Sequence, residues 1–151
     1  ATGTPPGRTG NVHPNLSPYE VFPCADGHVI IATGNDAQYR RLCGLLRLDG
    51  LAEARDYATN ADRVENRAAL FAALSAATGG WAKADLLAAC EAEGVPAGPI
   101  NDRAEVFADP QVRARGMQVT LDGVPGVRAP FRFSEAELKL DRPSPKLGED
   151  D

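Results

Sequence analysis

Hydrophobic and polar residues near the N-terminal end of the chain follow the pattern of two short strands joined by a tight turn. Tyr19, Val21 and Phe22 are residues that favour strands, and a β-branched run occupies positions 29–31. The Asp26-Gly27 pair between these stretches is a typical hairpin turn signal. The pattern therefore predicts an antiparallel β-hairpin.

After Gly34 the apolar spacing changes from two residues to three and four, which is typical of a helix with one buried face. The positions that share this face are Tyr39, Leu42, Leu45 and Leu46. The spacing predicts a helix over residues 37–47, with Asn35 or Asp36 as its N-cap. The second strand of the hairpin thus places two short polar side chains, Asn35 and Asp36, at a strand-to-helix junction, where functional groups are common.

Two further helices are predicted downstream, and a polar connector separates them from the first. Residues 51–63 form this connector, with Asn60 and Asp62 as candidate caps of the helix that follows. The helices are predicted over residues 65–77 and 81–93, and each is followed by glycine. The three helices together make a small helical layer.

The C-terminal third of the chain alternates short elements with turns. Two prolines make residues 95–101 extended, which suits a sheet edge or a loop. Asp102 and Glu105 form a capping-box pattern. Asp109 precedes a proline in the first helical position, so two short helices are predicted. Three later segments alternate like a hairpin or meander, namely residues 118–121, 124–127 and 129–134.

These elements predict an α+β fold, in which a small antiparallel sheet packs with about three main helices. We divide the chain into an extended arm over residues 1–17, a small α+β domain over residues 18–117, and a hairpin and tail over residues 118–151. The arm is rich in Gly, Pro and Asn and has no core of its own. We expect it to face a ligand or a neighbouring domain, and a mobile tail is the alternative.

Composition narrows the class of function. The chain has 151 residues, 43% hydrophobic and 25% charged, as in one globular domain. Its net charge of −5 argues against a nucleic-acid binder, because phosphate neutralisation needs clustered Lys and Arg. No apolar run approaches the roughly 18 residues of a membrane span, so no membrane contact is expected. The start lacks a signal-peptide pattern, and its Gly/Pro-rich residues without Met suggest a piece of a longer chain.

The cysteines and histidines offer little chemistry of their own. Cys24, Cys43 and Cys90 are an odd number without Cys-x-x-Cys spacing, and we expect buried thiols in a reducing compartment. That favours a cytoplasmic location. The two histidines, His13 and His28, are too few for a metal site, so no metal is expected. We expect His28 on the surface of a strand.

Several segments carry a resemblance that covers nearly the whole chain. They are Arg8-Thr-Gly-Asn-Val-His-Pro-Asn15, Pro18-Tyr-Glu-Val-Phe-Pro-Cys-Ala-Asp-Gly-His28, Gly34-Asn-Asp-Ala-Gln-Tyr39, Ala58-Thr-Asn-Ala-Asp-Arg-Val-Glu-Asn-Arg67, Gly94-Val-Pro-Ala-Gly-Pro-Ile-Asn101, Phe107-Ala-Asp-Pro-Gln-Val-Arg-Ala-Arg-Gly-Met117 and Pro145-Lys-Leu-Gly-Glu149. In this order and at these separations they strongly resemble the C-terminal portion of family III CoA-transferases. That group includes formyl-CoA transferase, carnitine CoA-transferase and α-methylacyl-CoA racemase.

The resemblance implies a small domain whose tail returns to a larger nucleotide-fold domain that precedes it. In the family this larger domain carries the aspartate that attacks the acyl-CoA thioester and forms a mixed anhydride. No residue of this chain matches that aspartate, so no catalytic residue is assigned and we expect the 151 residues alone to be inactive. The implied partners are acyl-CoA, a carboxylic acid acceptor and, in the full-length form, a second subunit of a homodimer. Coenzyme A is implied as a substrate, with no tightly bound cofactor.

The resemblance also implies that the arm lines the substrate, with Asn11, His13 and Asn15 as candidates. The arm occupies the place of a glycine-rich loop that closes over the bound intermediate in formyl-CoA transferase. Here Val12-His13-Pro14-Asn15 replaces the glycines, which favours a stiffer loop that lines an acyl pocket.

Further candidates follow the hairpin and the third helix. Asp36 falls where the racemase branch has a catalytic-site glutamate, so Asn35, Asp36 and Gln38 are expected to face the acyl group. The competing interpretation of Asp36 is a helix cap. Gly98 and Pro99 complete the set of expected substrate-lining residues.

Two alternatives to acyl transfer remain open from the sequence. One is an acyl-CoA racemase, which removes a proton from the α-carbon in place of transferring CoA. Asp36 preceded by Asn35 looks more like the transferase branch. The other alternative is a non-catalytic scaffold domain that serves dimerisation.

Overall fold

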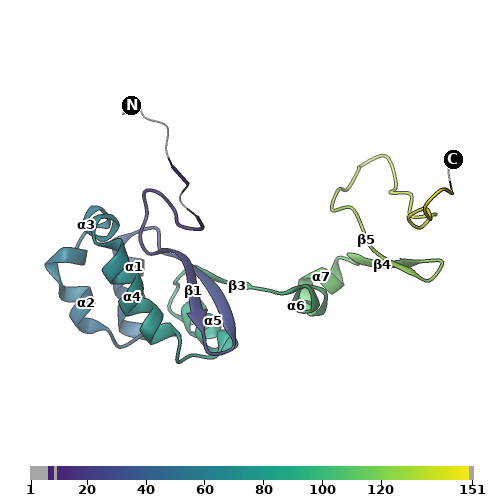
Figure 1. Ribbon diagram of the computed structural model, residues 1–151. Coiled ribbons are helices and arrows are strands. Elements are labelled where there is room, and N and C mark those ends of the chain that lie inside the picture. The colour runs from purple at the N-terminus through teal and green to yellow at the C-terminus, as the bar shows by residue number, and fades with distance from the viewer. Residues whose placement is uncertain (1–6, 9, 150–151) are drawn as a thin grey trace. The chain divides into compact units, whose positions relative to one another are not determined.

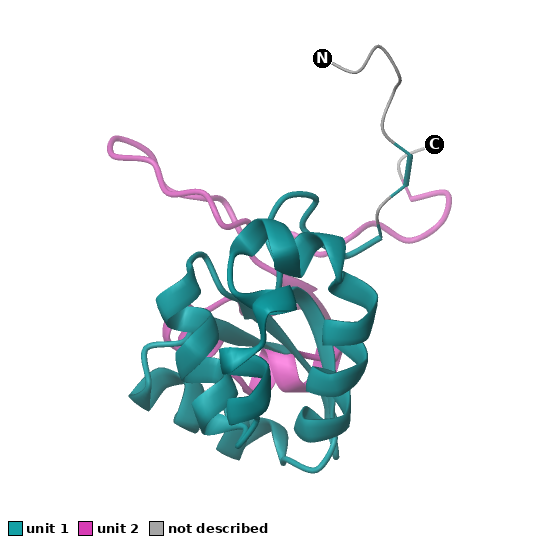
Figure 2. Ribbon diagram, turned by 90° about the vertical axis from the view of Figure 1, so that its left-hand side faces the viewer, with its two compact units in different colours: residues 1–100 teal, residues 101–151 magenta. Residues whose placement is uncertain are grey.

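The computed structural model describes residues 7–8 and 10–149. It divides into two compact units, residues 1–100 and 101–151, which Figure 2 colours separately. Each unit is described by itself. Most of the arm lies within the described residues, and positions 1–6 and 9 lie outside them. The proposed division into arm, domain and tail stays a prediction.

The predicted hairpin is confirmed and forms most of a three-stranded sheet. Strands β1 (Tyr19–Cys24) and β2 (Gly27–Ala32) are antiparallel neighbours joined by a two-residue turn (Figure 1). The proline-containing segment after the third helix supplies β3 (Ala97–Ile100), which pairs antiparallel with β2. The order β1-β2-β3 leaves β3 at an edge, where a proline without an N–H is tolerated.

The three predicted helices are confirmed as the longest helices among the described residues. They are α1 (Asp36–Leu45), α4 (Arg67–Thr78) and α5 (Lys83–Ala92). In the first unit α4 packs against β1, and α5 packs against β2 and β3 (Figure 1). The helices therefore cover one face of the sheet.

The prediction of a polar connector over residues 51–63 is wrong. This stretch holds most of α2 (Asp49–Glu53), the 3-10 helix η1 (Arg55–Tyr57) and the start of α3 (Asn60–Glu65). Leu51 and Tyr57 pack against the core, which gives these short turns a buried side that the polar composition conceals. Burial outweighs weak local propensity in such short segments.

Of the two alternative caps predicted for the first helix, Asn35 is confirmed and Asp36 is wrong, and the candidate caps Asn60 and Asp62 are wrong. Asn35, rather than Asp36, is the N-cap of α1, and its side chain accepts a hydrogen bond from the Gln38 N–H at 2.9 Å. Thr59, rather than Asn60, is the N-cap of α3 and forms a reciprocal capping box with Asp62. The hydrogen bonds from Thr59 lower the pKa of the Asp62 carboxyl.

The hydrophobic core belongs entirely to the first unit. Its buried side chains come from all three long helices and from β1 and β2, and they include Phe22, Ile31, Leu42, Leu70 and Leu86. Burying each such side chain contributes about 1.5–3 kcal/mol. Trp81 packs partly buried against this cluster, as a core anchor would, and His28 is exposed on its strand as predicted.

The second unit consists of two short helices and a hairpin. They are α6 (Arg103–Ala108), α7 (Pro110–Ala114), β4 (Gln118–Leu121) and β5 (Val124–Val127). Both predicted caps are confirmed, at Asp102 and Asp109. Residues 129–134 form no strand, so the predicted meander is wrong there; Pro130 lacks the N–H that a third strand would donate. No hydrophobic side chain is buried among the described residues of this unit.

The α+β class is confirmed, with two small antiparallel sheets. None of the helices that the model describes is long and apolar enough to cross a bilayer.

Candidate functional site

The arm and the start of α1 meet at one end of the three-stranded sheet. The backbone carbonyl of Pro18, just before β1, accepts hydrogen bonds from both the N–H and the Oγ1 of Thr33, just after β2, at 3.0 and 2.9 Å. The residues that precede Pro18 and those that follow Thr33 therefore adjoin the same end of the sheet. These two segments hold six of the eight residues predicted to line the substrate.

Three side chains from α3 and α4 bind consecutive carbonyls of the arm. Asn60 Nδ2 donates to Asn15 O at 2.8 Å, and Asn60 Oδ1 accepts from Ser17 N–H at 3.1 Å. Arg67 donates to Leu16 O at 3.0 Å, and Arg63 Nε donates to Ser17 O at 2.8 Å. The described end of the arm is thus tied to the helical layer at each residue from 15 to 17.

Arg63 is the most extensively bonded of these side chains. It is 1% exposed, and its guanidinium also donates to Tyr57 O at 3.0 Å and to Asp36 Oδ1 at 2.7 Å. The guanidinium carbon lies 4.5 Å from the centre of the Tyr39 ring. A buried cation is tolerated because a carboxylate and two carbonyls bind it. Arg63 therefore joins the arm directly to the first turn of α1.

His13 is held in one orientation within the arm. Its Nδ1 accepts from Asn15 N–H at 3.1 Å, and its ring stacks on Tyr19 with centroids 5.0 Å apart. Its backbone N–H donates to Tyr19 O at 3.0 Å. In the neutral ring the proton then lies on Nε2, which is a hydrogen-bond donor. No described residue accepts from this donor.

The turn into α1 uses the oxygen atoms of two side-chain amides. Asn35 Oδ1 caps the helix, and Gln38 Oε1 accepts from Gly34 N–H at 2.7 Å. Each amide therefore keeps its NH2 group for another acceptor, and among the described residues none is bound to it. Asn35 is exposed and Gln38 is half-buried.

The remaining candidates differ in their surroundings. Asn11 and Asn15 are exposed, and Asp36, whose side chain is 44% exposed, is bound to Arg63. Gly98 and Pro99 lie on β3, paired with Ile30 and Val29 in the middle of β2, rather than at the end of the sheet that adjoins the arm. The structure thus links the arm to Asp36 through Arg63, and it does not bring Gly98 and Pro99 to this end of the sheet.

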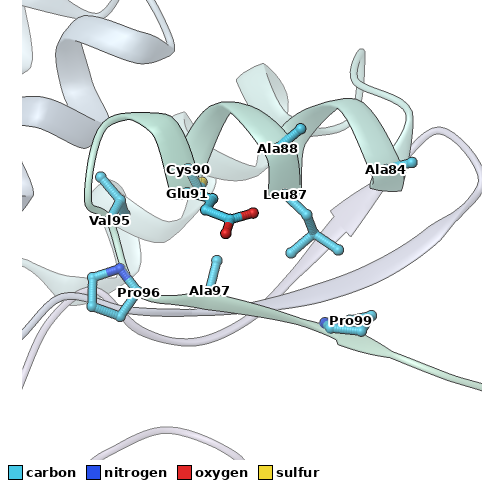
Figure 3. Close-up of a pocket in the computed structure, with 9 residues that line it drawn as sticks. All are labelled: Ala84, Leu87, Ala88, Cys90, Glu91, Val95, Pro96, Ala97 and Pro99. Atoms are coloured by element: carbon cyan, nitrogen blue, oxygen red, sulfur yellow. The ribbon is translucent and has the colours of Figure 1, made fainter. Parts of the chain in front are cut away.

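Pro99 instead lines an open pocket of about 620 Å³ between α5 and β3. Figure 3 shows Ala84, Leu87 and Ala88 on the helix side of this pocket, with Pro99 opposite and the Glu91 carboxylate directed into it. Gly98 is next to Ile30, on the other face of the sheet. Gly98 and Pro99 therefore face opposite sides of the sheet, and only Pro99 lines this pocket.

The chain was compared with protein families and with known proteins. The model of CoA-transferase family III matches residues 1–151. The chain belongs to CoA-transferase family III. It is 52% identical over 153 aligned positions to the succinate–glutarate CoA-transferase of Agrobacterium fabrum, with 98% of this chain and 38% of that protein covered. It is 37% identical to the acetyl-CoA:oxalate CoA-transferase of Acetobacter aceti, and the match covers 99% of this chain and 39% of that protein.

Solved structures are also similar to this chain. A CAIB/BAIF family protein from Brucella suis is 54% identical, with a TM-score of 0.90, over 99% of this chain and 39% of that one. Rv3272 from Mycobacterium tuberculosis, at 23% identity and a TM-score of 0.73, shares the fold. The chain spans about two fifths of the length of these family III relatives.

For a family III CoA-transferase, the residues that sequence reasoning missed are Asn60, Arg63 and Arg67. They lie within a segment that carried the resemblance, but only the two possible caps in it were given a role. The usable signal was their spacing of three and four residues, which would place the three side chains on one face of a continuous helix; in the structure the helix is interrupted at Asn66. A buried arginine is not visible from such a pattern, because its partners are backbone carbonyls.

The cysteines fit the expectation of unreactive thiols. Cys43 and Cys90 are buried and Cys24 is half-buried, all as free thiols. Burial raises the pKa of the Cys24 and Cys43 thiols and raises the pKa of Cys90 to about 11. They stay protonated at neutral pH and are poor nucleophiles. Among the described residues no three metal-ligating side chains gather.

Proposed function

We propose that the full-length protein moves CoA from an acyl-CoA donor to a carboxylic acid, and that residues 1–151 supply one wall of its active site. The 52% identity to a succinate–glutarate CoA-transferase is the observation that carries the proposal. Both acids named for that relative are short dicarboxylic acids. We propose the same class of acyl donor and acceptor here.

In the proposed reaction, a carboxylate from the part of the full-length protein outside these residues attacks the thioester carbonyl. The C–S bond breaks, CoA leaves as a thiolate, and a mixed anhydride forms. The thiolate then attacks the enzyme carboxyl of the anhydride, which releases the donor acid and leaves an enzyme thioester. The acceptor carboxylate attacks this thioester and forms a new anhydride and free thiolate. The thiolate takes the acceptor acyl group and frees the enzyme carboxylate. The 151 residues take no covalent part, so they are inactive alone.

Three hydrogen-bond donors of this chain suit the bound acid. They are His13 Nε2, Asn35 Nδ2 and Gln38 Nε2, and the other polar atom of each side chain is already bonded within the protein. A carboxylate or a thioester carbonyl offers only acceptors, so neutral donors are complementary to it. We propose that these donors bind the acyl group, with Asn11 and Asn15 beside them.

The remaining candidates and partners belong to the same proposal. Asp36 supports the wall through Arg63, and Gly98 and Pro99 stay proposed substrate-lining residues on β3, away from this end of the sheet. The full-length enzyme works as a cytoplasmic homodimer, in keeping with three free thiols, with coenzyme A as substrate and no tightly bound cofactor.

The test is CoA transfer by the full-length enzyme. Succinyl-CoA is supplied with glutarate, oxalate, mesaconate or acetate, and the new thioester is measured for each acid. We expect transfer to the dicarboxylic acids and none by residues 1–151 alone. Absence of transfer to every acid would contradict the proposal, and deuterium uptake at the α-carbon without transfer would identify a racemase.

A further inference from the structure

The described arm has no helix or strand of its own before Tyr19, yet its end is bonded at every residue from 15 to 17. We call Asn60, Arg63 and Arg67 the arm brace. All three bind backbone atoms of the arm, so the brace sets the path of the main chain whatever side chains the arm carries.

The brace reaches both segments of the proposed wall. Arg63 donates to Ser17 O in the arm and to Asp36 Oδ1 in the first turn of α1. Its guanidinium is planar and rigid, so these two acceptors are held at a fixed separation. Asn60 binds Asn15, whose own N–H orients the His13 ring.

We propose that Asn60, Arg63 and Arg67 are positioning residues that hold the arm as a fixed wall against the turn into α1. The brace sets the place of His13 Nε2 relative to Asn35 and Gln38. This inference rests on the proposed function, because those donors are the groups proposed to bind the acid. It predicts an arm that keeps its place whether or not substrate is bound.

Asn60→Ala is the main test, with Asn66→Ala as the matched control in the full-length enzyme. Each substitution removes an amide that makes two hydrogen bonds, but Asn66 binds Asp56 O and Asp62 O and not the arm. A displacement of the arm by about 1 Å lowers kcat/KM by up to about a hundredfold, as misplaced binding groups do. The expected change lies mainly in the KM of the acid.

A second matched pair tests the central residue of the brace. Arg63→Lys is the test variant, and Arg41→Lys is its control. Arg41 also donates to a backbone carbonyl, that of Gly94 at 3.2 Å, but it is exposed and bonded to the end of α5. Lysine keeps the charge beside Asp36 but cannot reach three acceptors in one plane. We expect loss of kcat/KM for Arg63→Lys and a change below about twofold for Arg41→Lys, as for most surface substitutions.

Backbone hydrogen exchange at residues 11–18 gives a readout independent of transfer. The His13 and Ser17 amides are hydrogen bonded, and Asn60→Ala is expected to speed exchange there while Asn66→Ala does not. Equal exchange and equal kcat/KM in each matched pair would overturn the inference. If the wild-type enzyme transfers no CoA, the proposed function fails, and the exchange comparison alone upholds or overturns the brace.

Discussion

Single residues at the sheet end combine a structural role with a proposed binding role, and at Asn35 the two roles belong to different atoms. Its Oδ1 caps α1, whereas its Nδ2 is the donor proposed for the substrate. The oxygen can be kept while the donor is removed, because aspartate also caps helices well.

We predict that Asn35→Ala destabilises the protein by about 1 kcal/mol and that Asn35→Asp does not. Both variants should lose acyl transfer, since neither carries the Nδ2 donor. Thermal unfolding and the kcat/KM of the full-length enzyme measure the two effects. Asn66→Ala, which removes an amide bonded to Asp56 O and Asp62 O and not to the arm, controls for loss of an amide elsewhere. Full activity of Asn35→Asp would refute the donor role.

Glu20 is a second residue whose setting predicts a measurable effect. It is 7% exposed, and burial raises the pKa of its carboxyl, while nearby Arg67 opposes that rise. The folded state therefore binds the Glu20 proton more tightly than the unfolded state does. Its contribution to stability is present below the unfolded pKa and is lost as pH rises through the folded pKa.

We predict that Glu20→Gln stabilises the protein more at pH 8 than at pH 4, because glutamine avoids an ionised carboxylate in a buried site. The pH dependence of the unfolding midpoint of each variant tests this. The same change at exposed Glu53 serves as the control substitution. If Glu20→Gln instead destabilises the protein more at pH 8 than at pH 4, attraction between the Glu20 carboxylate and Arg67 outweighs the cost of its burial.

At the scale of the elements, two glycines of the first unit respond to alanine in opposite directions. Gly94 ends α5 with a φ of +63°, a left-handed conformation that costs other residues about 1–2 kcal/mol. Gly44 lies inside α1 with open space beside it, where alanine gains about 0.5–1 kcal/mol.

We therefore predict that Gly94→Ala lowers the free energy of unfolding and Gly44→Ala raises it. Denaturant titration of the two variants beside the wild type measures both. If Gly94→Ala does not lower stability, the left-handed end of α5 is wrong; if Gly44→Ala lowers it, the open space beside Gly44 is wrong.

The sequence predicted those elements whose signal is local. The hairpin around Asp26-Gly27 and the long helices follow from apolar spacing and turn residues, and each has a buried face in the structure. The short helices between Asp49 and Glu65 escaped prediction because the core contacts of Leu51 and Tyr57 stabilise them. The predicted substrate-lining residues stay a prediction. The link between the arm and α1 could not be predicted, because Arg63 joins Ser17 and Asp36, which are far apart in sequence.

For the whole molecule, the two units differ in how they bury apolar surface. The first unit contains the whole described core, while Val127, Phe131 and Phe133 in the second are 64%, 64% and 59% exposed. Groups of exposed hydrophobic side chains such as these mark surfaces that contact another domain or another protein. This agrees with a second unit that packs on the rest of the full-length enzyme.

We predict that residues 1–100 fold by themselves as a monomer and that residues 1–151 associate in solution. Light scattering over a range of concentrations measures the association. Replacing Phe131 and Phe133 by serine should reduce it, because the exposed apolar area falls. A monomeric 1–151 chain at high concentration would contradict this account of the second unit.

The central claim is that the arm and the turn into α1 form a wall against the bound acyl group. Hydrogen exchange of the full-length enzyme with and without succinyl-CoA tests it most directly. We predict slower exchange on binding at residues 11–18 and 34–38, with no change at residues 44–53 across α1 and α2. Unchanged exchange in both segments, with saturating succinyl-CoA bound, would contradict the account.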